Sequence, residues 1–351
     1  MSQLLFVSPR LGVSWDEAVY VSQVSTHAPA AYFDAARARG VPLLVAPVAL
    51  VTSSVLALRV YLSVVSGLAL LAALGVWRRL RPAWVLALAG VAFGGLSLAQ
   101  YYGPQAMPDE WAALSGLAAV GFFLRAAAGH GHRGALAGLS ISLALAALFR
   151  PGDAIFLAAP LALAVITVRA WRRWPLLACV VAGTAVGVAE WVIEAYPRFG
   201  DPLARLHAAS REQGGLGLHV ALWDELRALD GPTLCRPCTI GWRYPELSLW
   251  WLALPVLVTF GVLAARRSGQ MGSSALAAIC GLSVAAQYLL LVGYAAPRIP
   301  AARLRAARDP GGGLPRLAGQ RDPPRHPRGC HPCRGRTPHR PPRGPASRPR
   351  S

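Results

Sequence analysis

The sequence predicts an all-α fold, a polytopic transmembrane helical bundle of about eight spans with outer-face loops and a disordered C-terminal tail. Two observations carry this prediction. The mean hydropathy is +0.42, with 54% apolar and only 15% charged residues, which is unlike a soluble enzyme. Apolar runs also recur from Val41 to Tyr294, and several approach the 20 residues that a helix needs to cross a bilayer core.

The spans are predicted from apolar stretches that Arg, Pro and Gly interrupt. The eight stretches cover residues 60–77, 83–101, 110–128, 134–149, 152–169, 174–195, 248–265 and 273–294. The segment 41–58 is apolar as well, but Pro42 and Pro47 interrupt it, and it predicts an interfacial helix on the outer face. A ninth span is the alternative for this segment. Residues 1–59 are therefore expected to form an outer first loop, ahead of a transmembrane domain over 60–296.

Arginines gather in alternate connections between the predicted spans. These are Arg78, Arg79, Arg81, Arg125, Arg133, Arg169, Arg172, Arg173, Arg266 and Arg267. By the positive-inside rule, these four connections face the cytoplasm. The first loop, the connection 102–109, the turn at Arg150 and the long loop 196–247 then face outward. Every acidic residue before the tail lies in those outer parts or at adjoining span ends. The prediction is a multi-pass protein of the plasma (inner) membrane, with membrane lipids as its surroundings.

The net charge of +19 resides mostly in the tail over 297–351, which holds 14 of the 35 arginines and 13 of the 29 prolines. Such a composition is typical of a disordered segment, but the preferred explanation is a shifted reading frame of a GC-rich gene, which would produce the same mixture of residues. The chain contains no lysine, so the charge reflects codon usage. A nucleic-acid partner is not expected.

The first outer loop presents the adjacent carboxylates of Asp16 and Glu17, followed by Tyr20. Two carboxylates in different surroundings can hold different protonation states and serve as a base and as a ligand for a hydroxyl or a metal. The alternative is structural: Ser14 caps a helix whose first turn carries the two acids.

Two further outer sites carry charge. Asp109 and Glu110 form a second acidic pair, which would equally suit a helix N-terminus. Arg150 lies beside Asp153 at the next outer turn, where a guanidinium can bind a lipid phosphate bidentately or pair with that acid.

These residues, in this order and on one side of the membrane, resemble the membrane-embedded GT-C type of glycosyltransferase, related to protein mannosyltransferases and lipid A aminoarabinose transferases. The resemblance covers residues 10–298. It rests on Asp16-Glu17 before Tyr20, Leu58-Arg59 opening a span, acids after Tyr101-Tyr102, and Arg150-Pro151. It implies transfer of a sugar from a polyprenyl-phosphate donor to an unidentified acceptor on the outer face, usually with inversion.

The resemblance also implies roles for individual residues. Asp16 would be the catalytic base, and Glu17 would orient the acceptor or the base. Substrate binding would fall to Tyr20, Asp109, Glu110 and Arg150, with Arg150 at the donor phosphate. No cofactor is indicated, no metal ligand set is assigned, and a divalent metal stays open.

Two departures from that family matter. No span precedes the acidic pair, and family members continue through further spans after the position of Arg298, so the chain is expected to be truncated at both ends. The competing interpretations are a non-catalytic or transporter-like polytopic membrane protein and an inactive truncated copy of the enzyme. The sequence shows no internal repeat and no acid at the centre of a span, which a transporter would favour.

The long outer loop contains Cys235 and Cys238. A disulfide is the preferred prediction for this pair, because an outer loop faces an oxidising compartment. Free thiols and a zinc site are the alternatives.

Overall fold

The computed structural model describes residues 2–129, 132–213, 249–267 and 269–291, together with five positions between 215 and 222. Within these ranges every regular element is helical, which confirms the all-α prediction. The tail over 297–351 and the cysteines at 235 and 238 lie outside the described residues.

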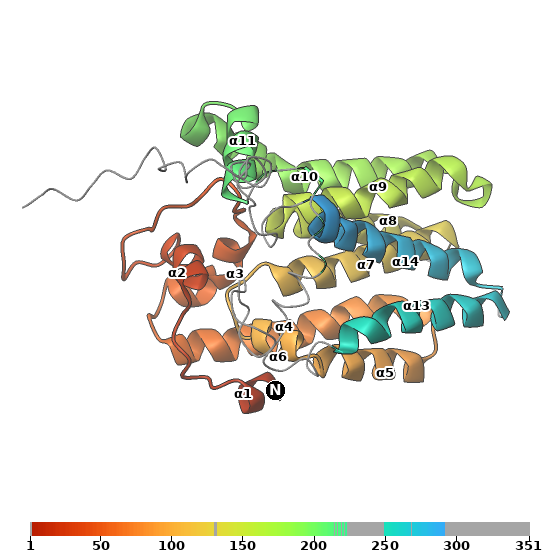
Figure 1. The fold of residues 1–351 in the computed structure, drawn as a ribbon, viewed down its shortest axis with the longest axis horizontal. Coiled ribbons are helices and arrows are strands. Elements are labelled where there is room, and N and C mark those ends of the chain that lie inside the picture. Colours follow the sequence, from red (N-terminus) through yellow and green to blue (C-terminus); the bar gives the residue numbers. More distant parts are fainter. Residues whose placement is uncertain are drawn as a thin grey trace, which may run out of the picture. The chain divides into compact units, whose positions relative to one another are not determined.

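The helices follow one another in the order drawn in Figure 1. They are α1 (Ser2–Phe6), α2 (Trp15–Ser22), α3 (Gly40–Ala49), α4 (Val55–Val76), the 3-10 turn η1 (Trp77–Arg79), α5 (Ala83–Gly94), α6 (Ser97–Tyr102), α7 (Asp109–Ala127), α8 (His132–Phe149), α9 (Pro151–Thr167), the 3-10 turn η2 (Arg169–Trp171), α10 (Trp174–Phe199), α11 (Pro202–Glu212), α13 (Leu249–Arg267), α14 (Met271–Ala286) and the π-helical turn η4 (Gln287–Leu291).

Three helical segments are long and apolar enough to cross a membrane, Val55–Arg79, Trp174–Phe199 and Met271–Leu290. Shorter apolar helices span Gly40–Ala49, Ala83–Gly94, Arg133–Phe149 and Pro151–Thr167. The chain is thus a membrane protein by helix length and composition.

The long helices lie side by side, and α2, α3 and α11 lie at one end of them (Figure 1). Helix α8 packs against α7 and α10, α9 packs against α14, and α4 packs against α7. Small residues allow the closest of these contacts: a Cβ on Gly183 of α10 would lie 2.5 Å from the Ser140 carbonyl oxygen of α8. Such close backbone approach is how helices associate in lipid, where burial of apolar surface gives little driving force.

Two opposite ends of the bundle are distinguished below. The polar end carries α2, α3, α11 and the turn at Arg150. The arginine-rich end carries the connections after α4, α7, α9 and α13 (Figure 1).

The predicted stretch 83–101 is not one continuous helix. Helix α5 ends at Gly94, and Leu96 adopts extended backbone angles before α6 begins. Two consecutive glycines, Gly94 and Gly95, weaken the helix at this point, since glycine lowers helix propensity by about 1 kcal/mol. The segment from 41 also differs from a span, because α3 has ten residues and rises only about 15 Å.

A buried ion pair connects the first loop to the bundle. Glu17 of α2 and Arg59 of α4 are each 1% exposed and bind each other through both carboxylate oxygens. The Glu17 carboxylate also accepts hydrogen bonds from the backbone N–H groups of Ser14 and Ala106, both at 2.9 Å. Arg59 donates to the carbonyl oxygen of Pro104 at 2.9 Å. Three segments distant in sequence are therefore held at one point.

Replacing Arg59 by Met should destabilise the protein strongly, because the Glu17 carboxylate would stay buried without its counter-charge. The expected loss is about 3–5 kcal/mol of unfolding free energy. It would be measured as a fall in the thermal unfolding midpoint of the detergent-solubilised protein. Arg10→Met, at an exposed position of the same loop, is the control and should change the midpoint little. The double variant Glu17→Gln/Arg59→Met should regain part of the loss; equal midpoints for Arg59→Met and Arg10→Met would contradict the prediction.

Candidate functional site

Helix α2 positions the first two candidate residues. Ser14 caps the helix by accepting from the Glu17 backbone N–H, and the Glu17 side chain accepts from the Ser14 N–H, which makes a complete capping box. Asp16 and Tyr20 are one turn apart and share a face of the helix. The structural interpretation of the acidic pair is therefore correct for Glu17, whose carboxylate is consumed by the cap and by Arg59.

Asp16 has a different environment from Glu17. Its side chain is 47% exposed, and one oxygen accepts from Arg37 Nη2 at 2.5 Å. Arg37 in turn donates to Asp34 at 2.6 Å and lies over the Tyr20 ring, 4.8 Å from its centroid. Burial opposes the charge of Arg37, but its bonds to the two aspartates keep its pKa above the ordinary value. Asp16 is thus an accessible carboxylate beside a permanent positive charge.

Arg150 is at the centre of a second cluster, between α8 and α9. It donates to Asp109 at 2.7 Å and to the Tyr288 hydroxyl at 2.5 Å. The Tyr288 hydroxyl donates to Asp153 at 2.6 Å. The π-helical turn that follows α14 supplies Tyr288, and such turns are frequent at functional sites. Arg150 Nε is buried and has no hydrogen-bond partner within the described residues.

Tyr20 lies between the Asp16–Arg37 cluster and the Arg150 cluster. The ring is 6% exposed, and burial raises the pKa of its phenol. Arg37 of the first cluster lies over this ring, and Tyr20 packs in one buried apolar cluster with Trp111 and Phe149. Trp111 lies two residues after Asp109, and Phe149 directly precedes Arg150. The structure therefore brings Asp16, Tyr20, Asp109 and Arg150 into one region of the polar end.

Glu110 points elsewhere than Asp109. It is 6% exposed, and one oxygen accepts from the Ser66 hydroxyl of α4 at 2.5 Å. Its other oxygen is buried without a partner among the described residues. Glu110 thus packs between α4 and α7, and it does not belong to the Arg150 cluster.

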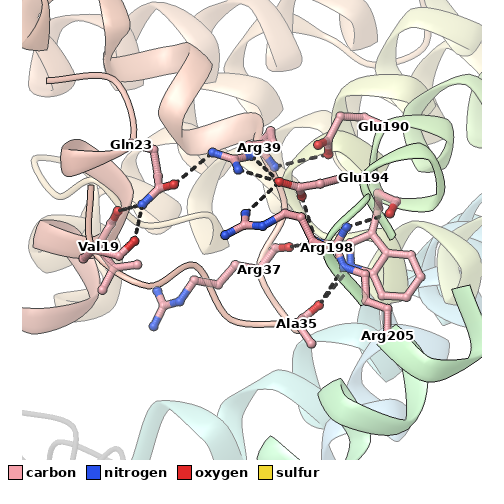
Figure 2. A network of polar contacts seen from close by, with 11 residues as sticks. Val19, Gln23, Ala35, Arg37, Arg39, Glu190, Glu194, Arg198 and Arg205 are labelled. Carbon is pink, nitrogen blue, oxygen red and sulfur yellow. Dashed lines mark hydrogen bonds and ion pairs between the residues drawn. The ribbon is translucent and has the colours of Figure 1, made fainter. Parts of the chain in front are cut away.

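A further network fixes the loop that carries Arg37 (Figure 2). Glu194 of α10 accepts from Arg39 and, at 2.8 Å, from Arg198. Arg39 also donates to Gln23 just after α2, at 3.1 Å. Its backbone N–H approaches Glu190, with a donor–acceptor distance of 3.4 Å. Glu194 therefore binds arginines of the loop and of its own helix.

Arg205 of α11 also belongs to the network that fixes the loop carrying Arg37. It is fully buried and donates to the backbone carbonyls of Ala35, Trp191 and Arg37 at 3.2, 2.7 and 2.9 Å. Its guanidinium also lies over the Trp191 ring, 4.5 Å from the centroid. Burial lowers the pKa of Arg205, and Glu194 opposes that effect. The backbone at Ala35 and Arg37 is therefore held by one side chain of α11.

Sequence reasoning named four of the residues that converge here, Asp16, Tyr20, Asp109 and Arg150. It missed Arg37, Arg205 and Tyr288. The sequence offered a weak indication of Arg37, because it is an arginine in the same loop as the acidic pair. Tyr288 offered none, because a tyrosine near a span end is ordinary in a membrane protein.

Within the part of the chain that the structure describes, no group of three or more His, Cys, Asp or Glu side chains is placed to hold a metal ion. No known protein family, curated protein or solved structure matches the chain. The function must therefore be argued from the site.

Arg205→Lys should loosen the Arg37 loop, because a lysine ammonium cannot reach three carbonyls in a planar fork. We expect amide hydrogens of residues 35–39 to exchange at least about tenfold faster, the loss that follows from one missing charged hydrogen bond. Hydrogen–deuterium exchange with mass spectrometry measures this. Arg198→Lys is the matched control, since Arg198 is 32% exposed and bonds only to Glu194 among the polar contacts in Figure 2. Equal exchange in both variants would refute the anchoring role.

Proposed function

We propose that the chain is a membrane glycosyltransferase that moves a sugar from a polyprenyl-phosphate donor to an acceptor at the outer face of the membrane. The observation that carries this proposal is the placement of an accessible carboxylate, Asp16, and of the Arg150 cluster around one apolar core that contains Tyr20, at one end of an apolar helical bundle. The proposal also rests on the resemblance in residue order described above.

Asp16 is the proposed base. In this reaction the acceptor hydroxyl gives its proton to a carboxylate oxygen while the hydroxyl oxygen attacks the anomeric carbon, and the bond from that carbon to the phosphate oxygen breaks. Glu17 cannot take this part in the present arrangement, because four donors already occupy its two oxygens. Its role in the proposal is to fix α2, so that Asp16 meets the acceptor.

Arg150 is the proposed partner of the leaving phosphate. A departing phosphate needs positive charge rather than a strong acid. The Arg150 side chain is 27% exposed, and the side chain of Asp109, which binds it, is 41% exposed. A donor phosphate that displaces Asp109 would meet Nη2 of a guanidinium that Tyr288 holds through Nη1. The neighbouring Nε has no partner among the described residues and could donate to the same phosphate.

The proposal places this end of the bundle on the outer side of the plasma membrane. About eight spans, with the predicted stretches crossing in turn, would put the arginine-rich end in the cytoplasm. The alternation of the connections between the two ends in Figure 1 supports this topology.

Asp16→Asn should lower the rate of sugar transfer by about 10²–10⁴-fold, the usual contribution of a general base. The assay uses membrane vesicles that contain the full chain and a panel of radiolabelled polyprenyl-phosphate sugars, and it follows release of sugar from the lipid phase. Asp34→Asn is the matched control, because Asp34 binds the same Arg37 but is not the proposed base. Equal losses in both variants would mean that Asp16 only holds Arg37.

Arg150→Lys should raise the KM for the lipid-linked donor by about tenfold, because lysine keeps the charge but loses the bidentate fork. Its kcat should fall as well, since the leaving phosphate carries more charge in the transition state. Arg198→Lys, which alters a partly exposed arginine of α10, is the control for steady-state kinetics. An unchanged donor KM in Arg150→Lys would remove Arg150 from the phosphate site.

A further inference from the structure

A cavity of about 200 Å³ opens at the arginine-rich end, far from the site described above. Four separate connections of the chain meet around it. Its lining consists of Trp77, Leu80, Arg81, Leu124, Ala127, Ala128, Trp171, Gln270 and Ser273. The cavity therefore lies where the ends of α4, α7, α9 and α13 come together.

One cation and two indole rings dominate the chemistry of this cavity. Arg81 is half-buried, and its Nη2 donates to the Ser274 hydroxyl at 2.8 Å. Trp77 donates its indole N–H to the Leu117 carbonyl oxygen at 3.1 Å. Trp171 packs edge-on against Phe123, with ring centroids 5.9 Å apart. These contacts fix the lining side chains in place, and the cavity is preformed.

The charge around the cavity is uncompensated. Ten arginines lie on the four connections at this end, and no Asp or Glu occurs within residues 35–108, 111–152, 154–189 or 247–308. Among the described residues, none of the ten forms an ion pair. Arg172 and Arg173 instead donate to backbone carbonyls, of Ile166 and Ala126. The anion that would balance this charge must come from outside the described part of the chain.

We propose that this cavity binds the phosphodiester head group of an anionic phospholipid in the membrane leaflet around the arginine-rich end. A basic pocket between helix ends, at the depth where tryptophans line a membrane interface, is the kind of site that selects anionic lipids. Arg81 supplies the cation for the phosphate, and the rings of Trp77 and Trp171 contact the glycerol and the first acyl carbons. This site goes beyond the proposed sugar transfer and does not depend on it.

The test compares two lipids on the purified full chain. The delipidated protein is incubated with mixed micelles of phosphatidylglycerol or phosphatidylcholine, and bound lipid is counted by native mass spectrometry. We expect preferential retention of phosphatidylglycerol, and we expect Arg81→Gln to reduce that retention about fivefold, as for loss of one guanidinium near an anionic head group.

Arg79→Gln is the matched control. It removes the same charge from the same connection, but Arg79 is exposed and does not line the cavity. This variant should keep most of the bound phosphatidylglycerol. Equal losses in the two variants would show diffuse attraction to the surface and would overturn the cavity site, as would equal retention of phosphatidylcholine.

Two further measurements test the cavity without changing its charge and distinguish a lipid from a soluble phosphate. Ala128→Phe fills the cavity from its exposed rim without changing charge, and it should also reduce retention; full retention in this variant would refute the site even if Arg81→Gln failed to fold. Inorganic phosphate at millimolar concentration should compete poorly, because it lacks the glycerol and acyl contacts. Displacement of the lipid by inorganic phosphate alone would assign the cavity to a soluble phosphate and would contradict the lipid proposal.

Discussion

The buried pair of Glu17 and Arg59 is the constraint on which the polar end of the molecule depends. Removing two charges from water is costly, and the cost is recovered only where the geometry satisfies every donor and acceptor. Here the backbone N–H groups of Ser14 and Ala106 and the carbonyl oxygen of Pro104 complete the set. The same interaction therefore fixes the start of α2, the beginning of α4 and the segment before α7. Because Asp16 directly precedes Glu17 in α2, its direction is set by a neighbour that takes no part in the proposed chemistry.

A second anchor acts on the other side of the proposed site. Arg205 and Glu194 hold the backbone and side chains of the loop that ends at Arg39, and that loop presents Arg37 to Asp16. The proposed base thus lies between two rigid supports, one on α4 and one on α10 and α11. The segment between α2 and α3 contains no regular secondary structure of its own. Side-chain ion pairs, rather than a sheet or a longer helix, therefore hold it in position.

The apolar pattern of the sequence predicted the helices well where the apolar run is continuous. It predicted them less well where glycines interrupt the helix within such a run. The ends of α7, α8 and α9 lie within two residues of the predicted stretches, because a run of apolar residues bounded by Arg or Pro has one stable form in lipid. The break at Gly94 and Gly95 was not predicted, since hydropathy averages over it. The pairing of Glu17 with Arg59 could not be predicted either: both residues were recognised, but partners 42 positions apart are selected by the packing of α2 on the bundle.

Arginine occurs at both ends of the bundle, yet its partners differ, and this difference bears on orientation. At the polar end, Arg37, Arg59 and Arg150 each bind a carboxylate, so their charge is neutralised within the fold. At the arginine-rich end Arg125 lies over the Phe122 ring, and the other arginines bind backbone carbonyls or a serine hydroxyl or are exposed to solvent. Uncompensated positive charge close to apolar helices favours retention on the cytoplasmic side and attraction to anionic lipids. The ion pairs that position Asp16 also neutralise the arginines of the polar end, so that end would be free to face outward. The same distribution of charge would thus position the proposed site and orient it in the membrane.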